Sequence, residues 1–268
     1  MSTFVLKEPH SPLLKATLIC ALAPVVLISA AFAQQPAVTL AAPRAGFAFP
    51  TKQTLTYSVD WRVFTVATAT VHFEADGDRE RVTATAETSG AINLLFHLSD
   101  KFQTSFDRNK GCTYEFDKQT VEGRRQINST LRLDYAQNKS ILDEKNLVTG
   151  QSKHVETAVQ GCLTDLFTGM FYTASQPLQV GQSFVVPVAD AERTVPVTMK
   201  VEGTEEIKTT LGTFKTIRVQ PTADAGVVKN RGNIWIWYTD DDRHLPVQMR
   251  ARSFWGTITF RLTGNDSK

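Results

Sequence analysis

The chain has 268 residues, of which 42% are hydrophobic, 29 are basic and 27 are acidic, giving a formal net charge of +2. This composition is typical of a globular protein, and a charge so near neutral argues against binding to nucleic acid or to an anionic membrane surface. The basic residues also alternate along the predicted strands instead of clustering. We therefore expect no nucleic-acid partner.

The first 33 residues have the pattern of a secretory signal peptide. Lys7 and Lys15 lie before or at the start of an apolar run over residues 16–31, and Ala31-Phe32-Ala33 is typical of an A-x-A cleavage site. The run is interrupted by Pro24 and is shorter than the roughly 20 apolar residues of a membrane span. We expect cleavage after Ala33, a periplasmic location and no transmembrane segment in the mature chain.

Residues 34–50 are rich in alanine and proline and have no hydrophobic period, so we predict a flexible leader before a single β-rich domain at 51–265. Signal cleavage leaves two cysteines, Cys112 and Cys162. In an oxidising compartment a disulfide is the simplest interpretation, the alternative being two buried free thiols. The remaining histidines are scattered singly, so no metal site is predicted.

The first half of the domain has a hydrophobic period of two, which predicts β-strands. The predicted strands are 54–61, 63–73, 82–87, 102–106, 112–116, 121–135 and 139–143, of which the last two are polar and edge-like. Turns are predicted at Asp76-Gly77-Asp78 and at Asn109-Lys110-Gly111. Between two of the strands, over 89–98, helical spacing of apolar residues predicts a short helix or a covering loop.

One segment has a clear helical pattern, Leu163–Ala174. Its apolar residues recur at spacings of three and four, Thr164 can cap its first turn, and Asp165 suits the positive end of the helix. Pro177 prevents its continuation. The apolar stripe of this helix needs a sheet against which to pack.

After the helix the strand pattern returns, at 183–188, 194–202, 205–210 and 214–219, followed by a loop at 224–230 and a β-meander over Asn233–Leu262. In the first meander strand, Ile234, Ile236 and Tyr238 alternate with Trp235 and Trp237, so both faces of the sheet should be covered there. We predict an all-β to β-rich α+β fold, a curved antiparallel sheet or open β-barrel packed around one main helix.

A series of short motifs runs through the chain in a specific order. They are Leu55–Trp61, Asp165–Tyr172, Leu178–Gln182, Val201–Ile217, Ile234–Trp237, Asp240–Val247 and Gly256–Leu262. This order resembles the bacterial exported family known as domain of unknown function 3108. The chain departs from that family's common form at Thr65-Val66-Ala67 and in its two cysteines. The resemblance implies a periplasmic β-protein, similar in fold to lipoprotein carriers of the LolA/LolB type, with no established catalytic residues.

No motif predicts catalysis or a cofactor. Asp240-Asp241-Asp242 could hold Ca²⁺, but aspartates are common in turns, and we predict a turn in which Arg243 pairs locally. Glu205 and Glu206 are adjacent on a strand, so their side chains face opposite ways and cannot share a proton. There is no nucleophile elbow and no zinc-protease motif. We therefore predict a protein that is not an enzyme and binds no cofactor.

The aromatic residues are the remaining candidates for a site. A curved sheet around a helix tends to leave a concave apolar face, which suits an apolar ligand. The candidate lining residues are Trp61, Phe106, Phe167, Phe171, Trp235 and Trp237, with the last two beneath the predicted helix, and the alternative for each of them is ordinary packing in the core. The favoured function is binding or carrying an apolar or amphipathic envelope component. The alternative is a structural protein that binds envelope proteins through exposed strand edges.

Overall fold

The computed structural model describes residues 39–88, 90, 93, 97–190, 193–230, 232–253 and 256–267. Residues 37–268 form one compact unit. The predicted signal peptide, the beginning of the predicted leader and most of the predicted helical segment at 89–98 lie outside the described residues. Phe254 and Trp255 lie outside them too.

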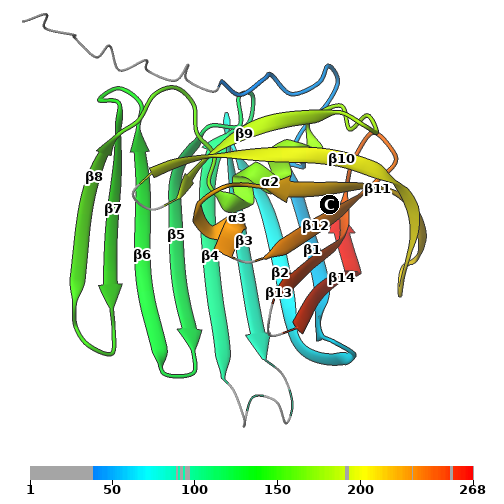
Figure 1. The fold of residues 1–268 in the computed structure, drawn as a ribbon, viewed down its shortest axis with the longest axis horizontal. Helices are drawn as coiled ribbons and strands as arrows, with labels where there is room; N and C mark the ends of the chain where they lie inside the picture. Colours follow the sequence, from blue (N-terminus) through cyan, green and yellow to red (C-terminus); the bar gives the residue numbers. More distant parts are fainter. Residues whose placement is uncertain are drawn as a thin grey trace, which may run out of the picture. The chain divides into compact units, whose positions relative to one another are not determined.

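Fourteen antiparallel strands of the described chain form one sheet, in the order β8-β7-β6-β5-β4-β3-β2-β1-β14-β13-β12-β11-β10-β9 (Figure 1). The strands are β1 Lys52–Trp61, β2 Phe64–Asp76, β3 Arg79–Thr88, β4 Leu98–Asp107, β5 Thr113–Glu122, β6 Arg125–Asp134, β7 Lys139–Asn146, β8 Ser152–Ala158, β9 Ser183–Asp190, β10 Arg193–Thr209, β11 Gly212–Thr222, β12 Asn233–Thr239, β13 Pro246–Ser253 and β14 Gly256–Ser267. With the exception of β8 and β9, strands adjacent in sequence are adjacent in the sheet, and the pairing of β1 with β14 joins the two halves. The sheet is not closed, because β8 and β9 are its outermost strands. The predicted open antiparallel sheet is confirmed.

Some strand predictions were wrong in detail. The two predicted strands at 194–202 and 205–210 are one long strand, β10, whose pairing with β11 shifts at a bulge between Val201 and Gly203. The segments predicted as edges became β6 and β7, which lie inside the sheet, while the edge is β8, for which the sequence gives no clear alternation. The predicted loop at 224–230 contains a short helix, α3 Gly226–Asn230.

The main helix, α2 Leu166–Ala174, begins three residues later than predicted. Its N-cap is Asp165, whose Oδ1 accepts hydrogen bonds from the backbone amides of Phe167 and Thr168 at 2.8 and 3.1 Å. Thr164, the predicted cap, instead forms a parallel bridge with Val188 of β9. Asp165, and not Thr164, caps the helix because the chain is still extended at Thr164, where it pairs with β9.

The Asp165 carboxylate also connects the helix to the sheet. The side chain has no solvent exposure, and its Oδ2 accepts hydrogen bonds from the hydroxyl groups of Thr104 in β4, Thr113 in β5 and Thr168 in α2 at 2.6, 2.8 and 2.6 Å. With the two amides, five donors satisfy one buried carboxylate. This meets the requirement that a buried charge be fully hydrogen-bonded, and it fixes the start of α2 over β4 and β5.

The described part of the predicted leader, residues 39–50, is packed against the domain. The Arg44 guanidinium donates to the carbonyl of Ala174 at the end of α2 over 2.7 Å, and the Tyr172 hydroxyl donates to the carbonyl of Ala41 over 2.7 Å. Phe49 is buried in the core. The prediction of a flexible leader was therefore wrong for this part, because its few apolar and basic residues find partners that a composition-based argument does not reveal.

The two faces of β12 are both covered, as the sequence predicts. Ile236 and Tyr238 pack in one cluster with Tyr172 of α2, and the Tyr238 hydroxyl donates to the carbonyl of Met170 over 2.8 Å. On the other face, Trp237 belongs to a second cluster that includes Ile207 from the end of β10. The helix thus covers one face of β12, and residues from the end of β10 cover the other.

Candidate functional site

The six aromatic residues predicted to line a ligand site lie in different surroundings. Phe106, Phe171 and Trp237 are buried in one core cluster, and Phe167 and Trp235 pack against it. The Phe171 ring contacts Phe73 in an edge-to-face pair with centroids 4.6 Å apart. Trp61 is 44% exposed at the end of β1. The structure therefore brings five of the six together, as packed side chains.

The prediction that Trp235 and Trp237 lie beneath the helix is wrong. The pairing of β12 with β13 shifts between Trp237 and Tyr238, but the extra residue is in β13, so the alternation along β12 continues. Tyr238 contacts α2, and Trp237 consequently points to the opposite face. There its indole nitrogen donates to Glu205 Oε1 over 2.9 Å.

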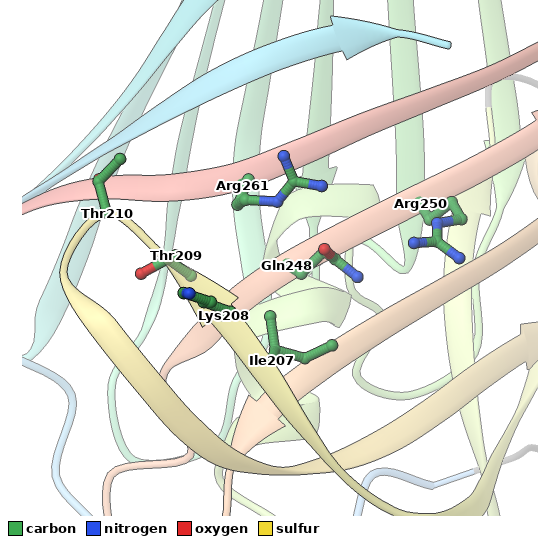
Figure 2. A pocket seen from close by; sticks show the side chains of 7 residues that line it. All are labelled: Ile207, Lys208, Thr209, Thr210, Gln248, Arg250 and Arg261. Carbon is green, nitrogen blue, oxygen red and sulfur yellow. The ribbon is translucent and has the colours of Figure 1, made fainter. Parts of the chain in front are cut away.

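A cleft lies on this opposite face. The end of β10 contacts β13 and β14, and a volume of about 430 Å³ remains between them. We call it the hairpin cleft, because it lies under the tip of the β10–β11 hairpin (Figure 2). It is lined by Ile207, Lys208, Thr209, Thr210, Gln248, Arg250 and Arg261. It is a shallow groove that is open to solvent over most of its extent.

Gln248 is the most unusual residue of the hairpin cleft. The residue is only 3% exposed, and its amide nitrogen Nε2 has no hydrogen-bond partner among the described residues. Figure 2 shows its side chain between those of Arg250 and Arg261. A buried N–H without an acceptor costs about 1–3 kcal/mol. An acceptor oxygen brought by a ligand would remove that cost.

The charges around Gln248 favour an anionic group. Arg261 Nη1 is paired with Asp60 Oδ2 at 2.9 Å, which neutralises its charge. Arg250 lies with its Cζ 5.3 Å from the centroid of the Trp237 ring, and within the described chain it has no carboxylate partner. Lys208 alternates with the inward-facing Ile207 and is exposed, so it belongs to the rim. The cleft therefore has an uncompensated positive charge beside an unpartnered N–H.

The carboxylates closest to this face are already bound. Glu205 accepts from Trp237 and also pairs with Arg218 Nη1 at 2.9 Å. Asp60 accepts from the Thr65 hydroxyl over 2.7 Å as well as from Arg261. Neither carboxylate is free to satisfy Arg250 or Gln248. A carboxylate or phosphate oxygen from a ligand could contact Arg250 directly, and Gln248 Nε2, which is shielded from solvent, after a movement of the side chains that cover it.

Sequence reasoning missed this site. Gln248, Arg250 and Arg252 alternate with apolar residues along β13, which is the only signal in the sequence that a polar face exists there. The remaining lining residues come from β10, from the turn after it and from β14. Only the folding of β10 over β13 and β14 brings the three strands to one place, and the hydrophobic period of a strand contains no information about such a contact.

Another buried ionisable group lies away from the cleft. Glu80 of β3 has no solvent exposure, and Arg108 Nη1 is 3.4 Å from its Oε2. Burial raises the pKa of Glu80 to about 7, against the opposing effects of Arg108 and of a backbone contact at Glu74. The side chain points to the same face as Val82, which is in the core. This group is a source of pH-dependent stability.

The predicted disulfide is present between Cys112 and Cys162, whose Cα atoms are 5.1 Å apart. The Asp240–Asp242 segment is a turn, as predicted, in which Arg243 Nη2 donates to Asp241 Oδ2 over 2.6 Å. Within the described ranges, no three His, Cys, Asp or Glu side chains are grouped closely enough to hold a metal ion. None of the helices in the described chain is both long and apolar enough to cross a bilayer.

The chain is similar in structure to a protein from Brucella abortus, described as a β-barrel-like protein of domain of unknown function DUF1849. The TM-score is 0.56 at 9% sequence identity, and the match covers 83% of this chain and 100% of that one. At this identity the similarity concerns the fold alone. No curated protein matches the sequence. Residues 56–263 match the family described as protein of unknown function (DUF3108), and the chain belongs to that family.

Proposed function

We propose that the protein is a non-enzymatic binding or carrier module for an amphipathic component of the bacterial envelope, and that the hairpin cleft holds the polar part of that component. The observation that carries this proposal is the buried Gln248 Nε2, which has no hydrogen-bond partner among the described residues, next to Arg250, which has no carboxylate partner among them. Buried polar groups in folded proteins are almost always hydrogen-bonded. A ligand with an anionic acceptor group would provide a hydrogen-bond partner for Gln248 and a charge partner for Arg250.

An amphipathic ligand fits better than a purely apolar one. The region around α2, where an acyl chain would be expected, is filled by side chains such as Phe73 and Phe171, whose rings are in contact. The hairpin cleft instead combines the side chain of Ile207 with the aliphatic stems and charged ends of arginines. The apolar part of a ligand would pack on Ile207, and its anionic head would contact Arg250.

The proposed location is the periplasm. The support is the signal-like pattern of the first 33 residues together with the bond between Cys112 and Cys162, since disulfides persist in oxidising compartments. Intact-mass measurement of the exported protein tests this. A chain that begins at Gln34 and is lighter by two hydrogens than its reduced form is expected, whereas a chain that retains residues 1–33 would contradict cleavage.

Native mass spectrometry of the protein purified from a bacterial periplasm tests the binding function. We expect an additional mass of an amphiphile on the wild-type protein and its loss from Gln248→Leu. Gln103→Leu, the same substitution at a partly buried glutamine of β4 away from the cleft, is the matched control and should retain the ligand. A ligand-free wild-type protein, or one that hydrolyses ester or glycan substrates, would contradict the proposal.

A structural role in envelope assembly has one specific observation in its favour. Within the described ranges, strand β8 pairs only with β7, so its other edge is open there to strand addition from another protein. Its side chains are mostly exposed and include the charged residues Lys153 and Glu156, which discourage unspecific pairing. Specific co-purification of one envelope protein, abolished by Val155→Pro in β8 and retained by Gln248→Leu, would favour this second function.

A further inference from the structure

The turns at one end of the sheet share a feature that the proposed function does not use. In an antiparallel meander, every second turn lies at the same end of the strands. The β1–β2, β5–β6 and β7–β8 turns therefore lie at one end of the sheet (Figure 1). The pairing of Trp61 with Ile258 places the β13–β14 turn at this end too. We call residues 61–64, 122–125, 145–152, 252–253 and 256–258 the turn rim.

The turn rim exposes large apolar side chains. In the β1–β2 turn, Val63 is 85% exposed, Phe64 64% and Trp61 44%. Ile258 beside it is 40% exposed, and Leu147 and Val148 in the β7–β8 turn are also exposed. Six of the ten exposed large hydrophobic residues of the described chain therefore lie on this rim, a concentration that indicates an interaction surface.

The β1–β2 turn is held in a defined position. The backbone amide of Arg62, whose φ of 57° is in the left-handed region, donates to the carbonyl of Thr257 over 2.9 Å. A Cβ at Gly256 would come within 3.2 Å of Trp61 Nε1 and 3.3 Å of Arg62 Nε, so a glycine allows this close approach. Val63 and Phe64 are thus exposed on a turn fixed to β14.

The charge of the turn rim is positive. Its residues include five exposed basic side chains and one acidic side chain, Glu122, which pairs with Arg125 at 3.1 Å. The basic residues are Arg62, Arg124, Arg125, Lys145 and Arg252. The near-neutral net charge, from which the sequence argues against an anionic membrane surface, conceals this local excess of basic side chains.

We propose that the turn rim contacts an anionic lipid surface, into which the side chains of Trp61, Val63 and Phe64 insert. Tryptophan and phenylalanine beside arginine suit the boundary between lipid head groups and acyl chains. The basic residues complement the charge of anionic lipids. The charge complementarity between the five basic side chains and anionic head groups is the reason for choosing a lipid surface, and capture of a protein is an outcome of the test below.

Co-flotation with vesicles tests this inference. The purified protein should float with vesicles of phosphatidylglycerol and phosphatidylcholine, and less with phosphatidylcholine alone or at high salt. Val63→Ser/Phe64→Ser should reduce binding at least about tenfold. These residues are exposed, so the variant should melt as the wild type does. Val180→Ser, 55% exposed before β9 at the opposite end, is the control and should bind normally.

Several results would overturn the proposal. The first three are the absence of flotation with anionic vesicles, equal flotation of the double variant and wild type, and equal binding of wild type to both vesicle types. The fourth is a double variant that still binds vesicles as wild type does but has lost dimerisation or the capture of one specific protein. None of them depends on the hairpin cleft. Ligand retention by the double variant in native mass spectrometry, with lost flotation, would support the rim and leave the proposed function intact.

Discussion

The indole nitrogen of Trp237 in β12 donates a hydrogen bond of 2.9 Å to Glu205 Oε1 in β10, across the intervening strand β11. Because Glu205 also pairs with Arg218 of β11, three neighbouring strands are connected by side chains on the face away from α2. Trp237 in turn lies under the Arg250 guanidinium. Trp237, one of the six residues predicted to line an apolar site, instead supports one side of a polar cleft.

Substitution of Trp237 should therefore lower stability. Trp237→Ala removes a side chain that is 3% exposed, and it should cost about 3–5 kcal/mol of unfolding free energy. Trp237→Phe retains most of the packing and should cost about 1 kcal/mol for the lost hydrogen bond. Urea denaturation measures both. Trp61→Phe, at a position that is 44% exposed, is the control, and a Trp237→Phe variant no less stable than this control would contradict the assigned role.

The hydrogen bonds to Asp165 predict a second effect on stability. Thr104→Val removes one of the hydroxyl donors to the buried carboxylate, and it should cost about 1.5–3 kcal/mol, because hydrogen bonds to charged groups are strong. Thr130→Val removes a hydroxyl that donates to Asp117 over 2.6 Å at a partly buried position, and it should cost less. If the two variants had the same denaturation midpoint, the Asp165 carboxylate would not be the anchor of α2.

Glu80 predicts a pH dependence of stability. Its pKa of about 7 in the folded protein is above that of the unfolded chain, so the proton binds the folded state more tightly. The resulting stabilisation is fully present below about pH 4.5 and is lost as the pH rises to about 7, with a total on the order of 3 kcal/mol. Glu80→Gln stays neutral, so the difference in unfolding free energy between this variant and wild type should shift in favour of the variant across that range.

Thermal unfolding of both proteins at several pH values measures this difference. Glu206→Gln, an exposed position on β10, is the control for a general change of charge. A difference between Glu80→Gln and wild type that stayed constant from pH 4.5 to 7.5 would show that Glu80 does not take up a proton in this range.

The disulfide predicts a fourth effect. Cys112 and Cys162 are 50 residues apart in the chain, and a bond that closes a loop of this length stabilises by up to about 4 kcal/mol in the chain-entropy model. Cys112→Ser/Cys162→Ser should therefore unfold at lower urea concentration and still fold, because the backbone bonds from Thr113 to Leu163 and from Thr164 to Pro187 remain. Equal stability of this variant and the oxidised wild type would contradict the prediction.

Much of the fold follows from local patterns. The alternation of Ile234, Ile236 and Tyr238 with the two tryptophans predicted a strand covered on both faces, and the structure has it. Which face of β12 packs against α2 depends on contacts between distant segments, namely the pairing of β1 with β14 and the packing of the helix on the sheet. The hairpin cleft was not predictable for the same reason, since Ile207, Gln248 and Arg261 meet only after β10 folds over two other strands.

The direct test of the hairpin cleft is a comparison of affinity with stability for Gln248→Leu. This substitution removes a buried amide nitrogen that has no partner in the part of the chain that the structure describes, so the ligand-free protein should be as stable as wild type or more stable. Isothermal titration with dodecyl phosphate below its critical micelle concentration should show binding to wild type, at least about tenfold weaker binding to Gln248→Leu and to Arg250→Gln, and unchanged binding to Gln103→Leu. Equal affinity for all four proteins, or no binding to wild type, would contradict the proposal that this cleft holds an anionic amphiphile.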